Sequence, residues 1–408
     1  MDFEKNLEKY AGLIVSTGLN ISKDDRLSIR CDEEGLPLAR LVSRMAYQKG
    51  ALHVEIDFSD DRMILDFYRE APPEALEYFP AYRIEYLEQK FKDGYHVLLI
   101  ETPNPELLKR ADPARIAAHQ KAAGLAHKPL QRYILEKKVK WNISAAPSPA
   151  WAKAVFPGLS EAEGMEKLWE TIFAVTRVNT PDPVKAWSDH DENIRSHIRY
   201  LNDAAFEKLL YRGPGTDLEV YLVDGHIWHG GSSDYRGTRF FANIPTEEVF
   251  TMPHADRVNG TVKATMPLSL RGNIIDNFRF TFTDGRVVDF DAEQGKDVLS
   301  DLMDMDEGAK RLGEAALVAH HSPISDTGLL YKSTLFDENA SCHFALGAAL
   351  HENLAGAAGR PEDENRNLGM NNSLIHIDFM IGSEELEVTG VKKDGTKITI
   401  LKNGDWAI

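Results

Sequence analysis

Apolar residues are spaced differently in the two halves of the chain. From Phe3 to Ile14 they recur at the spacing of an α-helix, and a second helix-like segment follows at 38–46. Short apolar runs typical of strands lie between and after these segments, at 26–30, 52–58, 95–100 and 141–145. Alternating strands and helices indicate βαβ units, so we expect an α/β N-terminal domain with parallel strands.

Turn signals dominate the second half. Asp-Gly pairs, which favour tight hairpin turns, begin at Asp224, Asp284 and Asp394. They predict an α+β, largely antiparallel C-terminal domain, with helices inserted near residues 194–210, 296–317 and 339–350. The pattern changes at 179–183, where two prolines with Asn and Asp interrupt it. A chain of 408 residues exceeds what one hydrophobic core usually serves, so we expect two domains, at 1–183 and 184–408.

Charge and composition narrow the possible partners. Lys and Arg number 47 against 64 Asp and Glu, which gives a formal net charge of −17 at pH 7. Such a surface repels nucleic acid and anionic membranes, so neither is an expected partner. The two cysteines, Cys31 and Cys342, are too few for a disulfide framework. With a charged N-terminal stretch and no apolar run near the ~20 residues that a membrane-spanning helix needs, we expect a cytoplasmic protein.

The most informative local pattern is a histidine and an aspartate two residues apart in the apolar run 373–380. Side chains in a strand alternate between faces, so His376 and Asp378 would point the same way, ~7 Å apart, while their apolar neighbours point into a core. Burying two such polar groups is costly unless something pairs with them, and a divalent metal is one such partner.

Three further segments carry candidate ligands. Pro245 fixes the backbone ahead of the acid pair Glu247 and Glu248, which enters a strand. Glu314 lies among small and apolar residues near the end of a predicted helix, and His343 falls in the first turns of another. Taken alone, each segment has a simpler interpretation: a charged strand entrance, the wet face of a helix, and a histidine satisfied in the core or at the surface.

Charge arithmetic favours a pair of metal ions. Glu248, Glu314 and Asp378 carry three negative charges, whereas His343 and His376 are neutral ligands. Two divalent cations carry four positive charges, and a bridging hydroxide would neutralise the remaining one. That hydroxide is the nucleophile of a two-metal hydrolase. Zinc, cobalt or manganese would fit carboxylate and imidazole ligands, so the C-terminal domain is predicted to be the metal-binding, catalytic one.

In order and spacing these segments resemble those of the aminopeptidase T and aminopeptidase S family of dinuclear metallo-aminopeptidases, nearly end to end. The matching segments are 243–251, 312–318, 335–340 with His343, and 376–382. The resemblance implies a two-domain fold and a homodimer that admits short peptides with a free N-terminus and releases their N-terminal residues. It implies two divalent metal ions per chain, held by Glu248, Glu314, His343, His376 and Asp378.

One position departs from the family pattern. Seven residues after the metal histidine the family has a tyrosine at its metal centre, and this chain has Leu350. A phenol could bind metal, donate a proton or stabilise an oxyanion, and leucine can do none of these. Tyr331 and His351 are the candidates to replace it. Glu247 and Glu338 are the candidates to carry the proton from water to the leaving amine.

Two alternatives remain open. His343, His376 and Asp378 also suit a single non-haem iron that activates oxygen, and ring-cleaving dioxygenases with a similar fold are known. A mononuclear site does not need Glu248 and Glu314, which argues against this interpretation. A metal-stabilised peptide-binding module without turnover would gain support if the missing tyrosine disables the chemistry.

Overall fold

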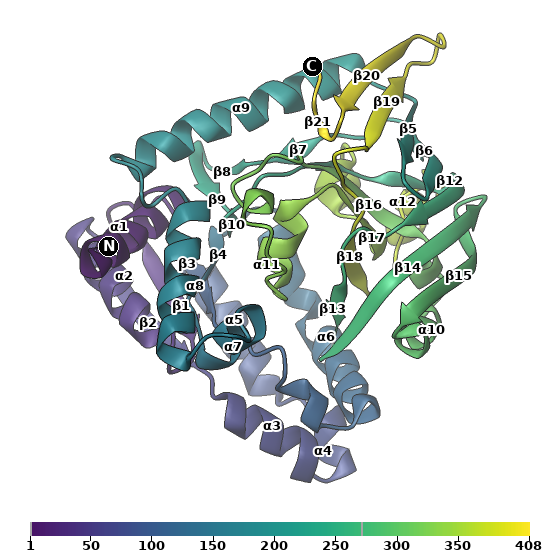
Figure 1. Ribbon diagram of the computed structural model, residues 1–408. Helices are drawn as coiled ribbons and strands as arrows, with labels where there is room; N and C mark the ends of the chain where they lie inside the picture. Colours follow the sequence, from purple (N-terminus) through teal and green to yellow (C-terminus); the bar gives the residue numbers. More distant parts are fainter. Residues whose placement is uncertain (1, 271) are drawn as a thin grey trace. The chain divides into compact units, whose positions relative to one another are not determined.

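The computed structural model describes residues 2–270 and 272–408, which divide into two compact units (Figure 1). The first unit comprises the residues up to Asp191 together with Ser232–Pro245. The second comprises Glu192–Gly231 and Thr246–Ile408. The proposed border between residues 183 and 184 falls at the start of helix α9 (Pro183–Ala204), which contributes residues to both units.

A parallel five-stranded sheet forms the centre of the first unit, in the order β10-β4-β3-β1-β2. Its strands are β1 (Arg26–Cys31), β2 (His53–Phe58), β3 (Tyr95–Glu101), β4 (Trp141–Ala145) and β10 (Asn243–Ile244). Two short strands, β8 (Ser232–Tyr235) and β9 (Thr238–Phe241), pair separately. The predicted α/β architecture with parallel strands is confirmed.

Helices connect these strands, and several begin where the sequence supplies caps. Ser160 and Glu163 form a capping box at the start of α8, and the Asp60 side chain accepts a hydrogen bond from the backbone N–H of Met63 in α3. The helices before α9 are α1 (Phe3–Leu13), α2 (Leu36–Gln48), α3 (Asp61–Glu70), α4 (Pro73–Glu77), α5 (Ala81–Lys92), α6 (Pro113–Leu135), α7 (Pro149–Val155) and α8 (Glu161–Val175). Across residues 2–270 and 272–408, no helix has both the length and the apolar character that crossing a bilayer requires.

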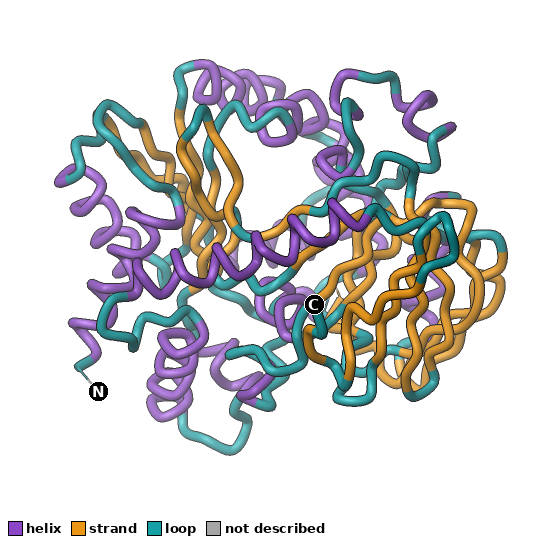
Figure 2. Tube along the Cα trace, turned by 90° about the horizontal axis from the view of Figure 1, so that it is seen from above, coloured by secondary structure: helices purple, strands orange, loops and turns teal. Residues whose placement is uncertain are grey.

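The second unit contains a large antiparallel sheet, in the order β13-β14-β12-β6-β5-β19-β20-β21, with β15 paired to β14. Its long strands form the orange group beside the C-terminus in Figure 2. The strands are β5 (Lys208–Gly213), β6 (Thr216–Leu222), β12 (Pro253–Lys263), β13 (Leu268–Leu270), β14 (Asn273–Thr283), β15 (Arg286–Gln294), β19 (Glu387–Val391), β20 (Lys397–Lys402) and β21 (Asp405–Trp406). The hairpin turns predicted at Asp284 and Asp394 join β14 to β15 and β19 to β20. The hairpin predicted at Asp224 is wrong, because the preceding strand β6 pairs with β5 and β12 instead.

A second antiparallel sheet of this unit has the order β18-β17-β16-β11-β7. Its strands are β7 (His229–Gly230), β11 (Val249–Thr251), β16 (Leu312–Leu317), β17 (His343–Gly347) and β18 (His376–Met380). Phe344 lies 4.9 Å from Tyr211 of β5, and Phe379 lies 5.2 Å from Phe280 of β14, as measured between ring centroids. One face of this sheet therefore packs on the large sheet in a shared core, and the other face is left for the functional side chains.

Parts of the three predicted helices of this unit are strands. The helix predicted over 194–210 ends at Ala204, and β5 begins at Lys208. In the segment 296–317, Lys296–Met303 forms an α-helix (α10) and Gly308–Lys310 a single 3-10 turn (η3), and Glu314 lies on β16. The helix predicted over 339–350 is wrong at His343, which is the first residue of β17. Short helices precede and follow this segment in the chain, α11 (Thr334–Asp337) and α12 (Glu362–Asn367). All residues of β16 and β17 are buried, so neither strand shows the alternation that marks a half-exposed strand in a sequence.

Candidate metal centre

One face of the sheet carries four of the five predicted ligands on β16, β17 and β18. Residues that pair directly across an antiparallel ladder point to the same face, and Glu314 pairs with Ala345, which pairs with Asp378. His343 and His376 each stand two residues from a member of this row, so they share its face. The sheet thereby gathers side chains that are far apart in the sequence.

Glu248 joins them from the neighbouring strand. It directly precedes β11, and Phe250, two residues later, pairs with Ala316, which pairs with His343. The alternation of side chains therefore puts Glu248 on the ligand face. On the other flank, Gly230 of β7 approaches so closely that a Cβ atom there would lie 2.3 Å from the Glu248 carbonyl oxygen.

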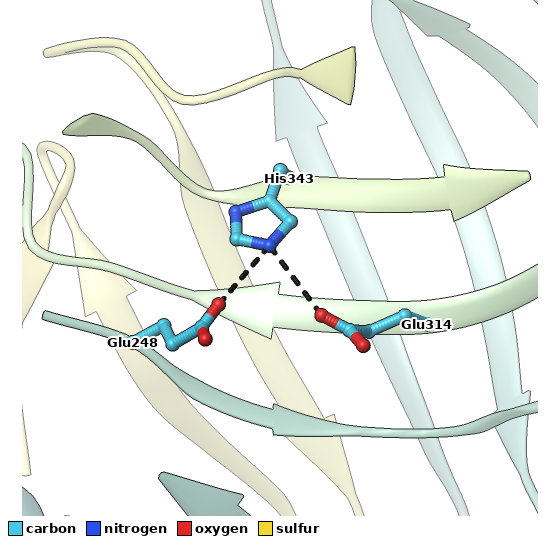
Figure 3. Close-up of side chains that lie close together, drawn as sticks. All are labelled: Glu248, Glu314 and His343. Carbon is cyan, nitrogen blue, oxygen red and sulfur yellow. Dashed lines mark ion pairs between the residues drawn. The ribbon is translucent and has the colours of Figure 1, made fainter. Parts of the chain in front are cut away.

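Distances within the cluster define two groups of ligands. His343 Nε2 lies 3.2 Å from Glu248 Oε2 and 3.4 Å from Glu314 Oε1, and Figure 3 shows both carboxylates turned towards this imidazole. His376 Nε2 lies 3.6 Å from Glu314 Oε2 and 3.3 Å from Asp378 Oδ1. In each group one ligand atom per residue lies within 4.8 Å of the others. Glu314 belongs to both groups and directs one carboxylate oxygen to each histidine.

Backbone carbonyl groups orient the two imidazoles. His343 Nδ1 lies 3.0 Å from the carbonyl oxygen of Ser341, and His376 Nδ1 lies 2.7 Å from that of Ala348. A carbonyl oxygen only accepts hydrogen bonds, so Nδ1 is the donor in both rings. When neutral, each ring would present the lone pair of Nε2 to the cluster, as metal-binding histidines do.

The pKa values of the cluster reflect burial and strong mutual attraction. Burial would lower the pKa of His343, but hydrogen bonds to Glu248 and Glu314 raise it well above its ordinary value. Burial likewise opposes charge on His376, but the interaction with Asp378 raises its pKa to about 10. Burial raises the pKa of Glu314. Protonated imidazoles thus supply the positive charge that the carboxylates require, and a divalent cation would bring that charge in their place.

The side chains of the cluster fit divalent cations in their chemistry. Asp378 Oδ1 is buried, and its ion-pair partner is His376 Nε2 at 3.3 Å. A buried carboxylate oxygen requires a positively charged neighbour, which a cation would supply when the imidazole is neutral. Ala316, Ala345 and Gly347 are the small residues that occupy positions between the candidate ligands on this face. Carboxylates and imidazoles without thiolates suit zinc, cobalt or manganese.

The two candidate proton carriers lie beside the cluster in different ways. Glu338 opens the short helix η5 (Glu338–Ala340), and burial together with the charges of Glu248 and Asp378 raises its pKa well above its ordinary value. Glu247 lies in the loop before β11, where its backbone N–H donates to Asn339 Oδ1. The electrostatic interaction of Glu338 with Glu248 and Asp378 makes it the better supported of the two.

Tyr331 lies in the core of the second unit. It is fully buried, its hydroxyl lies 3.1 Å from Thr327 Oγ1, and its ring stacks on Phe336 with 4.9 Å between centroids. These contacts are those of a structural residue, and a role for Tyr331 in proton transfer stays a prediction.

Leu350 and His351 lie at the rim of the ligand face, where the chain leaves β17. The short helix η6 (His351–Asn353) follows, and the carbonyl oxygen of Glu352 accepts a hydrogen bond of 2.7 Å from His229 Nε2. His229 pairs with Phe250, so it stands on the ligand face. The backbone of this turn therefore lies against the ligand face at His229.

Sequence reasoning missed the residues that hold the ligands in place. Gly230 lies directly against the Glu248 carbonyl group. The carbonyl oxygens of Ser341 and Ala348 orient the two histidines. Asn339 accepts a hydrogen bond of 2.7 Å from the backbone N–H of Glu247. Backbone carbonyls leave no signal in a sequence. Asn339 leaves none either, because it directly follows the acids Asp337 and Glu338, and a polar residue in such a stretch gives no sign in the sequence that it is buried.

Known proteins resemble the chain over its whole length. Residues 3–406 match the family described as thermophilic metalloprotease (M29). Aminopeptidase 2 of Geobacillus stearothermophilus is 45% identical over 406 residues, covering 99% of this chain and 98% of that protein. Aminopeptidase AmpS of Bacillus subtilis is 43% identical over 99% of both chains, and aminopeptidase T of Thermus thermophilus is 41% identical over 100% of this chain and 99% of that protein.

Solved structures also resemble the chain over its whole length. Wild-type AmpT from Thermus thermophilus is 40% identical and superimposes with a TM-score of 0.94 over 100% of both chains. A 2,5-dihydroxypyridine dioxygenase from Pseudomonas putida has a TM-score of 0.58 at 10% identity, covering 100% of this chain and 98% of that chain. This second likeness is one of fold alone.

Proposed function

The chain belongs to the thermophilic metalloprotease (M29) family, and we propose that it is an aminopeptidase that uses two divalent metal ions to release N-terminal residues from short peptides. The relatives named as aminopeptidases support the reaction. One observation carries the two-ion proposal: Glu314 belongs to both ligand groups. A carboxylate with one oxygen directed to each group is what a bridging ligand requires.

The ligands would divide between two sites that share Glu314. Glu248 and His343 complete the first, and His376 and Asp378 complete the second. Divalent ions bound there would supply Lewis acidity and would lower the pKa of bound water. The three carboxylates carry the negative charge that attracts the divalent cations.

Glu338 is the proposed proton carrier. Its raised pKa suits a carboxyl that takes a proton from the attacking water and returns it to the leaving amine near neutral pH. Asn339 Nδ2 donates a hydrogen bond of 3.3 Å to Glu338 Oε1, which fixes the carboxylate beside the cluster.

The proposed oxygenase and binding-module alternatives have less support. A mononuclear iron site needs His343, His376 and Asp378, whereas Glu248 and Glu314 also converge here within 3.4 Å of His343. The named relatives likewise support hydrolysis over binding without turnover. The proposal also includes zinc, cobalt or manganese as the metal, a homodimer and a cytoplasmic location.

The proposal is tested on chelator-treated protein restored with zinc, cobalt or manganese. We expect about two ions per chain by elemental analysis and release of the first residue from dipeptides. The same dipeptides with an acetylated N-terminus should stay intact, because an acetylated nitrogen has no free lone pair to offer a metal ion. If no ion restores release from any unblocked dipeptide, the aminopeptidase proposal is wrong.

A pair of matched variants separates the bridging carboxylate from acidity in general. Glu314→Gln removes the charge common to both groups, so it should lower metal content below one ion per chain and abolish release. Glu293→Gln removes an exposed glutamate of β15 in the same unit and should change neither. Two ions retained by Glu314→Gln would contradict the shared-ligand arrangement.

A further inference from the structure

Asn339 makes three hydrogen bonds from the interior of the second unit. Its side chain is fully buried. Oδ1 accepts the backbone N–H of Glu247 at 2.7 Å, and Nδ2 donates to the Leu335 carbonyl oxygen at 3.0 Å and to Glu338 Oε1 at 3.3 Å. One amide thus contacts the backbone next to the ligand Glu248 and the carboxylate of the proposed proton carrier.

The orientation of this amide follows from its partners. A backbone N–H can only donate, so the atom that faces Glu247 is the oxygen. A backbone carbonyl can only accept, so the atom that faces Leu335 is the nitrogen. The nitrogen is therefore also the atom that faces Glu338, and the three contacts are consistent with a single rotamer.

We propose that Asn339 is the positioning residue that sets the relative placement of the ligand Glu248 and the proton carrier Glu338. Its oxygen anchors the backbone one residue before Glu248, where the chain enters β11. Its nitrogen holds Glu338 at the start of η5. Both atoms belong to one rigid planar group, so neither element can shift without the other. This inference rests on the proposed function for the role of Glu338, but not for the placement of Glu248.

Two substitutions separate the two contacts. Asn339→Asp keeps an oxygen for the Glu247 N–H but turns a second oxygen towards Glu338 Oε1 and the Leu335 carbonyl, which repels both. Asn339→Ala removes both contacts. Asn365→Ala is the matched control, because Asn365 is a buried amide of the same unit whose Nδ2 donates to Ala357, away from the ligands.

Kinetics on metal-loaded protein test the link to Glu338. We expect Asn339→Asp to lower kcat about 100-fold with KM changed less than about threefold, as for loss of a positioned proton carrier. Added to Glu338→Gln, it should cause no further loss, because residues that act as a unit are not additive. A wild-type kcat in Asn339→Asp, a wild-type kcat in Glu338→Gln, or losses that multiply in the double variant would overturn the proposal.

Metal affinity, measured by competition with a chelator, tests the link to Glu248 without turnover. Asn339→Ala should bind zinc about tenfold or more weakly, because a ligand has lost its support, while Asn339→Asp and Asn365→Ala should keep wild-type affinity. Equal affinities in Asn339→Ala and Asn365→Ala would overturn the placement of Glu248 by Asn339. If wild-type protein cleaves no peptide, the proposed function fails while this affinity comparison still decides the structural part.

Discussion

Replacing Gly230 by alanine would move the proposed metal ligand Glu248 without changing its side chain. Gly230 pairs with Val249, and its φ of 152° lies in a region that favours glycine. An added Cβ would lie 2.3 Å from the Glu248 carbonyl oxygen, whereas ordinary contact begins near 3.4 Å. The two strands must therefore separate by about 1 Å at this point, and Glu248 moves with its backbone.

The size of the effect follows from that displacement. Glu248 Oε2 lies 3.2 Å from His343 Nε2, so a shift of about 1 Å takes the carboxylate out of register with its group. A misplacement of about 1 Å in an active centre costs ~100-fold in rate, or about 2.7 kcal/mol of transition-state stabilisation. The strained backbone should also lower the free energy of unfolding by about 1–3 kcal/mol.

Gly225→Ala separates these two costs. Gly225 has a φ of 80° and no atom within 4 Å of its would-be Cβ, so this variant bears backbone strain alone. Thermal unfolding, zinc affinity and kcat/KM on a dipeptide are measured for both. We expect both to unfold at lower temperature, and Gly230→Ala alone to lose affinity and ~100-fold in kcat/KM. The reasoning is refuted if Gly230→Ala keeps wild-type kinetics, or if Gly225→Ala loses as much.

Three further predictions concern the same face. The first concerns His376, whose pKa is raised from its ordinary value of 6.5 to about 10. In chelator-treated protein the protonated imidazole therefore adds fully to the free energy of unfolding below pH 6.5. This contribution is lost as the pH rises to about 10. Thermal melts should show that loss, and metal-loaded protein should not. Leu350→Tyr should raise kcat about tenfold or more by placing a phenol at the rim, whereas Leu350→Phe, which lacks the hydroxyl, should not. Phe250 stands beside Glu248 on the ligand face, so Phe250→Ala should extend cleavage to dipeptides with bulkier N-terminal residues. If the variant cleaves the same dipeptides as the wild type, Phe250 does not line the pocket for the N-terminal side chain.

Sequence patterns were most informative where local and long-range preferences agree. The alternating apolar strands and helices before residue 150 predict the parallel sheet of the first unit, and Asp284 and Asp394 predict two hairpins. The alternation around His376 and Asp378 correctly puts both on one face of a strand, with Phe379 in the core. No local sequence pattern indicates which residues of two strands pair when the strands are far apart in the sequence. The convergence of Glu248 with Glu314 could therefore be inferred only through a resemblance.

Helices are predicted around Glu314 and His343, but these segments form the strands β16 and β17. The residues that make a helix the expected structure also shape the candidate site. The segments around Glu314 and His343 are rich in alanine and glycine, and alanine is the best helix former, so propensity predicts helices there. In the sheet those same residues stand between the ligands: Ala345 lies between Glu314 and Asp378, and Ala316 lies beside His343. Valine or isoleucine, which strands prefer, would place larger side chains between the proposed ligands. Tertiary packing overrides local propensity at these strands, and the small side chains that result suit the proposed metal centre.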